Sequence, residues 1–252
     1  MYKHIKLGLI LLLIIVYTII YLLFSHQVSK IFYILANKLG GIKLTNTTIR
    51  VHGNTTNFSN NNLLIMSNHY HFNDGNILYD LYYKNNSIET LHTIVKADFF
   101  TDPTADQKIL HLLSCIQDTF LSSVYFIPYK RGDKADGQKI RNTIVDTLSD
   151  GKNILVFPEG TSHKNGFPKE FKKGTFEIAV ENKLRILPIT IKYEKDIGKE
   201  KGEPVNLLNI FDNVVDIYIH DLIDETDECY KEKNPEGLKN KVYTIITAPL
   251  LV

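Results

Sequence analysis

The stretch from Leu63 to Tyr83, LLIMSNHYHFNDGNILYDLYY, joins a strand pattern to a helix pattern through a polar loop. Its first five residues, Leu63 to Ser67, form a short apolar run that is typical of a buried strand. The segment from Asn76 onward has the pattern of a helix, and Asp74 stands where an N-cap carboxylate would bind the first free backbone N–H groups. The stretch therefore predicts a strand followed directly by a helix, with two histidines and an acid in the connection.

The alternation of strand and helix patterns continues after Gly41. Strands are predicted over 48–52, 63–67, 91–95, 124–127, 153–157, 186–193 and 214–219. Helices are predicted over 76–83, 105–116, 136–148, 175–181 and 238–247. Strands separated by helices of about ten residues indicate an α/β fold with a largely parallel or mixed sheet flanked by helices. No linker is long enough to divide residues 46–252, so we expect one domain there.

Parallel sheets of this kind bind ligands beyond the carboxyl ends of their strands. The loops after Met66, Ile127 and Phe157 are therefore the expected places for functional side chains.

Composition excludes some classes of function. The chain has 252 residues and a formal net charge of +1, so no overall positive field would attract nucleic acid, and no such partner is expected. Two cysteines, Cys115 and Cys229, lie far apart with no C-x-x-C spacing. They argue against a disulfide framework and against a thiolate zinc site.

The N-terminus predicts a membrane anchor over residues 1–26. Leu7 to Phe24 are eighteen residues without a charge. As a helix they would be about 27 Å long, close to the ~30 Å hydrocarbon core of a bilayer. A cleaved signal peptide would usually have a shorter apolar region and a small-residue cleavage site, and a core helix this apolar on every face would be unusual.

Residues 27–45 are expected to form a linking helix between the anchor and residues 46–252. Apolar groups recur at helical spacing over 28–43 and end at Gly40-Gly41. This helix would lie either on the bilayer surface or in an ordinary core. Lysines flank the apolar segment on both sides, so the positive-inside rule gives no orientation.

His69 and Asp74 form the first candidate catalytic group. A carboxylate five residues after a histidine can fold back to hold one imidazole nitrogen, so that the other can accept a proton from a hydroxyl. The alternatives are that Asp74 only caps a helix and that His69 only bonds to backbone. His69 and His71 also form an H-x-H pair, but Asn73 and Asp74 replace the Asp and His of the H-x-H-x-D-H metal motif, so no metal site is predicted.

Further candidate binding residues follow two other strands. Glu159 and Gly160 come directly after the apolar run NILVF, where the glycine lets a ligand approach the backbone, although a turn whose glutamate faces water is the alternative. Lys172 precedes the next predicted helix, and Arg131 follows Lys130 after another strand. A base and several cations at strand ends suit an anionic substrate that carries a hydroxyl. Neither a G-x-S-x-G elbow nor a dinucleotide or P-loop motif occurs.

Taken together, these segments resemble the glycerolipid acyltransferase family, whose best-known members are the 1-acyl-glycerol-3-phosphate acyltransferases. Four motifs of that family have matching segments here, in the same order along the chain. The first is N-H-x-x-x-x-D at 68–74, and the second is an apolar strand ending in arginine at 126–131. The third is F-P-E-G-T at 157–161, followed by F-K-x-G at 171–174, and the fourth is an apolar run around one proline at 186–189. Lys96 also matches a lysine that the family often carries. The ordered set, spread over about residues 60 to 195, is far more specific than any one motif.

The resemblance implies a glycerol-3-phosphate acyltransferase-like fold and a function. His69 would take the proton of a lysophospholipid hydroxyl, and Asp74 would fix its tautomer. Acyl-CoA would be the co-substrate, with no cofactor. The acceptor most expected is 1-acyl-glycerol-3-phosphate, and the expected substrate-binding residues are Arg131, Glu159, Gly160, Thr161, Lys172 and Lys96.

One departure from the family pattern concerns the acceptor. The residue before the family arginine is often acidic, and here it is Lys130, which adds a cation beside the acceptor or changes its preference. Another lysophospholipid or glycerol-3-phosphate, a membrane-anchored metallohydrolase and a non-catalytic lipid-binding relative stay open as alternatives. Because acyl-CoA is cytosolic, a single-pass anchor with the catalytic domain facing the cytosol is expected.

Overall fold

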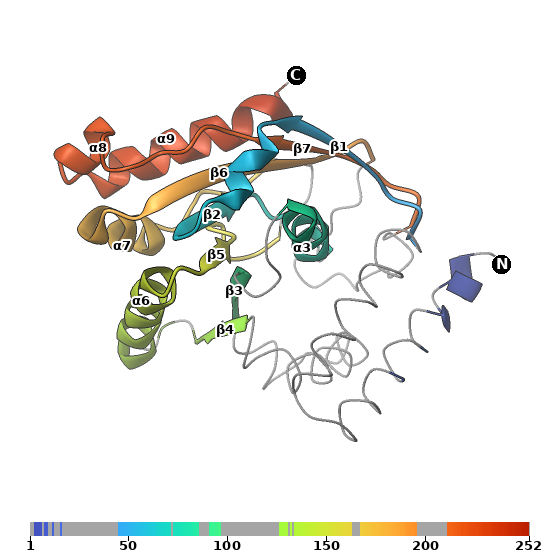
Figure 1. The fold of residues 1–252 in the computed structure, drawn as a ribbon, viewed down its shortest axis with the longest axis horizontal. Helices are drawn as coiled ribbons and strands as arrows, with labels where there is room; N and C mark the ends of the chain where they lie inside the picture. Colours follow the sequence, from blue (N-terminus) through green and yellow to red (C-terminus); the bar gives the residue numbers. More distant parts are fainter. Residues whose placement is uncertain are drawn as a thin grey trace.

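The computed structural model describes residues 3–6, 8–9, 12, 16, 45–71, 73–85, 91–96, 126–130, 132, 134–162, 167–195 and 211–251. These residues contain a seven-stranded sheet in the order β1-β7-β6-β2-β5-β3-β4 (Figure 1). The strands are β1 (Thr48–Gly53), β2 (Leu63–Ser67), β3 (Leu91–Lys96), β4 (Phe126–Tyr129), β5 (Asn153–Val156), β6 (Arg185–Tyr193) and β7 (Val214–Ile219).

The sheet is mixed but largely parallel. Neighbouring strands are parallel except β6 and β7, which are antiparallel. The carboxyl ends of β2, β3, β4, β5 and β6 therefore lie along one edge. The α/β architecture and the predicted sheet type are confirmed.

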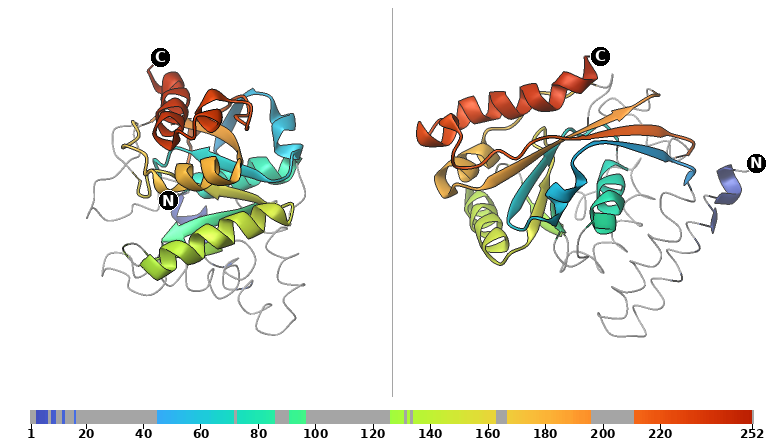
Figure 2. Two further views of the ribbon diagram at one scale, coloured as in Figure 1. Left: turned by 90° about the vertical axis from the view of Figure 1, so that its left-hand side faces the viewer. Right: turned by 45° about the horizontal axis from the view of Figure 1, so that its top comes forward.

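Alternate residues of β2 face two different helix layers. Leu64 and Met66 pack in a core with residues of α6 (Lys134–Ser149), α7 (Gly174–Asn182) and α9 (Pro235–Thr247). Leu63 and Ile65 pack on the opposite face with α3 (Asp74–Asn85) and the 3₁₀ helix η1 (Thr55–Ser59). Figure 1 and the right-hand view of Figure 2 show α3 on one side of the sheet and α6, α7 and α9 on the other.

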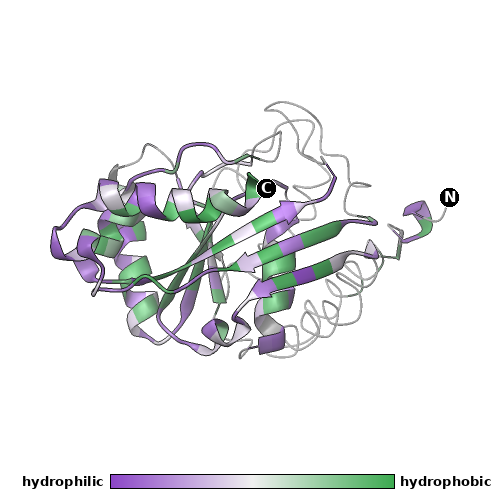
Figure 3. Ribbon diagram, turned by 90° about the horizontal axis from the view of Figure 1, so that it is seen from above, coloured by the Kyte–Doolittle hydropathy of each residue, from purple (hydrophilic) through white to green (hydrophobic). Residues whose placement is uncertain are grey.

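Burial on both faces explains why the central strands are continuous apolar runs. All five residues of β2 are buried, whereas the edge strand β1 is mostly exposed. In Figure 3 the central strands are coloured largely hydrophobic, and the helices carry hydrophilic and hydrophobic residues in alternation. Burying one Leu or Ile side chain stabilises the fold by about 1.5–3 kcal/mol, so β2 is a firm base for the loop that follows it.

Several element ends differ from the prediction. Helix α3 begins at Asp74, two residues before the predicted start. Strand β5 ends at Val156, so Phe157 lies outside the sheet. Strand β4 lies two residues later than predicted, and the short helix α8 (Glu228–Lys231) and the 3₁₀ helix η4 (Ala248–Leu250) were not predicted. The predicted helix over 105–116 lies outside the described residues.

The predicted anchor and linking helix also lie almost wholly outside the described residues. Of residues 7–24, only 8, 9, 12 and 16 are described, and of 27–45 only Thr45. Within the described part of the chain, no helix combines the length and the apolar character needed to cross a membrane. The boundaries at 26 and 45 stay predictions.

Candidate active site

The loop after β2 brings His69 and Asp74 together. The Nδ1 atom of His69 donates to Oδ2 of Asp74 over 3.0 Å. The Asp74 side chain is fully buried, whereas 23% of the His69 side chain is exposed. With Nδ1 bonded to the carboxylate, Nε2 is the ring nitrogen left to accept a proton from a substrate.

Among the described residues, Asp74 receives four hydrogen bonds. Its Oδ2 atom accepts the His69 bond and two from backbone N–H groups, those of Tyr70 at 2.6 Å and His71 at 2.8 Å. Its Oδ1 atom accepts from the hydroxyl of Tyr193 over 2.6 Å. A buried carboxylate is costly without such partners, so these four donors allow an aspartate to be placed behind the histidine.

The N-cap prediction for Asp74 is wrong. The carbonyl of Asn73 accepts the first helical bond, from the backbone N–H of Ile77 at 3.1 Å, and Asp74 is the first residue of the helix. The Asp74 carboxylate points back into the preceding loop and binds the N–H groups of Tyr70 and His71. It closes the loop on itself, which places its Oδ2 atom beside the histidine ring.

Glu159 holds the backbone of the same loop. Its Oε1 atom accepts from the N–H of His69 at 2.7 Å, and Oε2 accepts from the N–H of Lys169 at 2.8 Å. Glu159 is only 1% exposed. Glu159 is predicted to bind the acceptor, and in the structure its carboxylate faces inward and holds the backbone of His69.

Two further contacts fix the histidine. Its ring stacks on Phe157, with ring centroids 4.4 Å apart and an interplanar angle of 27°. The preceding residue, Asn68, pairs its side-chain amide with the backbone N–H and carbonyl of Ile191, both at 2.8 Å. Asn68 thereby extends the pairing of β2 with β6 beyond the end of β2 and prevents the loop from shifting.

Three of the predicted substrate-binding residues follow β5. Gly160 has φ +69°, a left-handed conformation that glycine adopts without strain. Thr161 and the Lys172 side chain are exposed, and the Lys172 N–H donates to the carbonyl of Pro158 at 2.8 Å. The backbone bond holds the lysine segment against the turn while leaving both side chains accessible.

The remaining predicted cations are Arg131 and Lys96. Arg131 is outside the described residues, and Lys96 ends β3, where its side chain is not described. Because strands are about 4.8 Å apart, the end of β5 lies about 5 Å from β2, that of β3 about 10 Å, and that of β4 about 14 Å.

His71 has a different environment from His69. It is 5% exposed, and its Nδ1 accepts from the N–H of Asn73 at 3.4 Å. Its ring packs edge-on against Tyr193 at 6.2 Å. In the described ranges, no three His, Cys, Asp or Glu side chains converge as a metal site would require. His71 is therefore a buried residue that packs behind the candidate active site.

Sequence reasoning missed Tyr193. Burial raises the pKa of its hydroxyl well above its usual range, and the charge and hydrogen bond of Asp74 raise it further. The available signal was its position at the end of a predicted strand. The order of the strands, which places β6 beside β2, was needed to show that this strand end meets the His69 loop.

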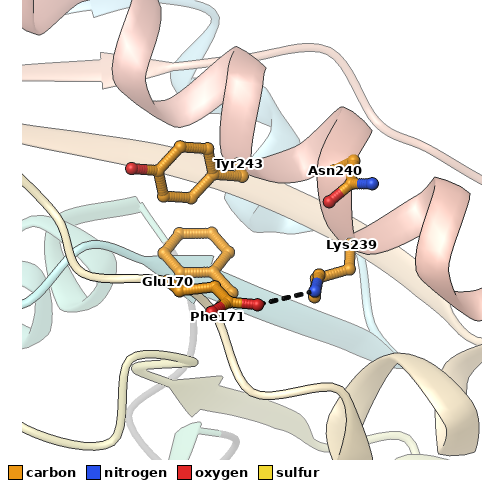
Figure 4. Close-up of a pocket in the computed structure, with 5 residues that line it drawn as sticks. All are labelled: Glu170, Phe171, Lys239, Asn240 and Tyr243. Carbon is orange, nitrogen blue, oxygen red and sulfur yellow. Dashed lines mark hydrogen bonds and ion pairs between the residues drawn. The ribbon is translucent and has the colours of Figure 1, made fainter.

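The C-terminal part of the chain supports the segment that Glu159 binds. Tyr243 of α9 packs edge-on against Phe171 at 5.0 Å, and the Nζ atom of Lys239 lies 3.1 Å from the Glu170 carboxylate. These residues and Asn240 line a pocket of about 250 Å³ (Figure 4). Helix α9 thus supports the segment after Pro168, a contact that the sequence did not predict.

Comparison with known proteins identifies the family of this chain. The acyltransferase family model matches residues 48–192, more than half of the chain. The 1-acyl-sn-glycerol-3-phosphate acyltransferase alpha of Homo sapiens is 32% identical over 100 residues, which are 39% of this chain and 35% of that protein. Glycerol-3-phosphate acyltransferase 3 of Danio rerio is 33% identical over 89 residues, 34% of this chain and 19% of that protein.

The matched region thus spans about a third or less of the length of these relatives. A solved structure adds agreement in fold. The crystal structure of the 1-acyl-sn-glycerophosphate (LPA) acyltransferase PlsC from Thermotoga maritima has a TM-score of 0.56, with 19% identity over 97% of this chain and 98% of that one. The family match covers both His69 and Asp74. The relatives named here are glycerolipid acyltransferases. Because the family model matches more than half of its residues, this chain belongs to the acyltransferase family.

Proposed function

We propose that this protein transfers an acyl chain from acyl-CoA to the free hydroxyl of a lysophospholipid, with 1-acyl-glycerol-3-phosphate as the acceptor and phosphatidic acid as the product. The observation that carries the proposal is the 3.0 Å bond between His69 Nδ1 and Asp74 Oδ2. It fixes the tautomer in which Nε2 is a base, on a ring that is partly exposed beside a fully buried carboxylate.

The reaction follows from this pair. Nε2 of His69 takes the proton from the acceptor hydroxyl as the oxygen attacks the thioester carbonyl of acyl-CoA. Asp74 stabilises the imidazolium that forms. The carbon–sulfur bond then breaks, the acyl chain stays on the acceptor oxygen, and CoA leaves as the thiolate, which regains a proton from the imidazolium. No covalent enzyme intermediate is needed, in keeping with a sequence that lacks a G-x-S-x-G nucleophile elbow.

The acceptor phosphate is assigned to the strand-end cations. Lys172 is exposed and has no ion-pair partner within the described residues. Gly160 and Thr161 lie in the turn after β5, the strand next to β2. Arg131 and Lys96 complete the proposed set, with the arginine binding phosphate through two parallel hydrogen bonds.

The N-terminal segment is proposed to bring this site to its lipid substrate. The apolar length of Leu7–Phe24 supports a membrane anchor over residues 1–26. Residues 27–45 would link the anchor to an acyltransferase domain over 46–252. The domain would face the cytosol, where acyl-CoA is found.

Glycerol-3-phosphate is the second candidate acceptor. It has the same phosphate and a free hydroxyl, and some of the relatives are named glycerol-3-phosphate acyltransferases. The test is an assay of the purified full-length protein with acyl-CoA and three acceptors: lysophosphatidic acid, lysophosphatidylcholine and glycerol-3-phosphate. We expect phosphatidic acid and free CoA in equal amounts with the first, and slower turnover with the other two. Hydrolysis of acyl-CoA without acylated product, or no thioester cleavage, would overturn the proposal.

A further inference from the structure

We infer that Tyr193 is a positioning residue of the active site, which acts through Asp74 to set the orientation and the proton affinity of His69. The inference rests on the proposed role of His69 as the base. The observation behind it is the 2.6 Å bond from the Tyr193 hydroxyl to Oδ1 of Asp74, the carboxylate oxygen opposite the one that holds His69.

The two oxygens of Asp74 are held differently. Oδ2 binds three N–H groups from its own loop, those of His69, Tyr70 and His71. Within the described part of the chain, Tyr193 supplies the donor to Oδ1, and it comes from strand β6, 119 residues away. Tyr193 is therefore the contact that ties the carboxylate to the sheet and fixes the plane in which it meets the imidazole.

The tyrosine itself is firmly held. Its backbone pairs with Val215 of β7 at the end of the β6 ladder. Its ring packs against Tyr70 at 5.5 Å and against the edge of His71 at 6.2 Å. Burial and the neighbouring Asp74 carboxylate keep the pKa of Tyr193 well above its usual range, so the hydroxyl remains a donor throughout the pH range of an assay.

The charged groups around His69 determine how loss of the Tyr193 hydroxyl should change the proton affinity of the histidine. Asp74 of α3 bonds to its ring, and Glu159, which follows β5, bonds to its backbone N–H. A hydrogen bond from Tyr193 withdraws charge from Asp74 and weakens its attraction for the imidazolium. Without the hydroxyl, the carboxylate attracts the His69 proton more strongly, and the histidine becomes harder to deprotonate.

The test is the pH dependence of kcat/KM for the full-length protein with Tyr193→Phe. We expect the acid limb of the profile to move to higher pH by about 0.5–1 unit. Above the limb we expect kcat to fall about 3–10-fold because the base is less well oriented. The KM values should change little. Tyr230→Phe is the matched control: its buried hydroxyl bonds to the carbonyl of Leu184 over 2.5 Å in a part of the fold that does not touch His69.

If Tyr193→Phe does not fold, a second variant still tests the inference. Replacing Tyr193 by 3-fluorotyrosine preserves the ring and makes the hydroxyl a stronger donor, so the acid limb should move to lower pH. An unchanged limb in the folded variants would overturn the inference. His69→Ala, assayed in parallel, separates the role of Tyr193 from the proposed function. If His69→Ala loses activity and the acid limb is unchanged in the Tyr193 variants, only the role of Tyr193 is refuted. If His69→Ala keeps full activity, the proposed function is refuted.

Discussion

Replacing Asp74 by asparagine removes one negative charge from the site and keeps its shape. The surrounding donors decide which way the amide faces. Oδ2 accepts from three N–H groups, so an amide nitrogen at that place would face three donors. Oδ1 meets a hydroxyl, that of Tyr193, which can accept as well as donate. The amide oxygen should therefore take the Oδ2 position, and its nitrogen should donate to Tyr193.

This orientation sets the size of the effect. The Nδ1–H group of His69 keeps an acceptor, so the useful tautomer survives. What is lost is the difference between a charged and a neutral hydrogen bond to the imidazolium, about 1–2 kcal/mol, or roughly 5–30-fold in kcat. A reversed tautomer would cost far more, about 10⁴-fold in a Ser-His-Asp triad with the same substitution.

The assay is release of the CoA thiol from acyl-CoA in the presence of lysophosphatidic acid. Thermal unfolding of each variant checks that the fold is retained. Asp74→Ala is the contrasting variant, because it leaves three N–H groups and one hydroxyl without an acceptor, at about 1–3 kcal/mol each, and should be strongly destabilised. A loss near 10⁴-fold in folded Asp74→Asn would mean that the hydrogen bonds around Asp74 are wrongly assigned. An unchanged rate would mean that Asp74 has no part in the reaction.

Three other variants test separate parts of the site. Glu159→Gln should lower kcat about tenfold and destabilise the fold by about 1–3 kcal/mol, since its amide nitrogen must face the N–H of either His69 or Lys169; wild-type kinetics and an unchanged melting temperature would contradict this. Arg131→Lys should lower kcat/KM for lysophosphatidic acid roughly 10–100-fold, because an ammonium cannot form the bidentate bond, and should affect lysophosphatidylcholine less; equal losses on both acceptors would show that Arg131 does not bind the phosphate. Deletion of residues 1–26 should release much of the protein from membranes, and a full-length protein that fractionates away from membranes would disprove the anchor.

The sequence predicted the sheet and the contact between His69 and Asp74 because both depend on short-range patterns. Strand β2 is a continuous apolar run, and such runs are typical of strands that are buried on both faces. The spacing of His69 and Asp74 allows a loop to fold back on itself, and the structure shows that fold. In each case neighbouring residues contain a local signal, and the ordered set of motifs makes it specific.

The supports of the site could not be predicted in the same way. Glu159, which follows β5, and Tyr193, at the end of β6, contact the His69 loop only because β5 and β6 become the neighbours of β2 when the sheet forms. A glutamate after a strand is as compatible with a surface turn as with a buried acceptor of two N–H groups. Asp74 was predicted to cap a helix because it stands before a helix pattern, whereas its carboxylate bonds to the N–H groups of Tyr70 and His71 in the preceding loop.

The central claim is that His69 is the base of an acyl transfer. It is tested most directly by comparing His69→Ala with His71→Ala in the formation of phosphatidic acid from lysophosphatidic acid and acyl-CoA. Both variants remove an imidazole from the same loop, but only His69 bonds to Asp74 through its ring. General-base assistance contributes about 10²–10⁴-fold, so His69→Ala should lose at least a hundredfold in kcat and His71→Ala much less. Equal losses, or a greater loss in His71→Ala with both variants folded, would contradict the account.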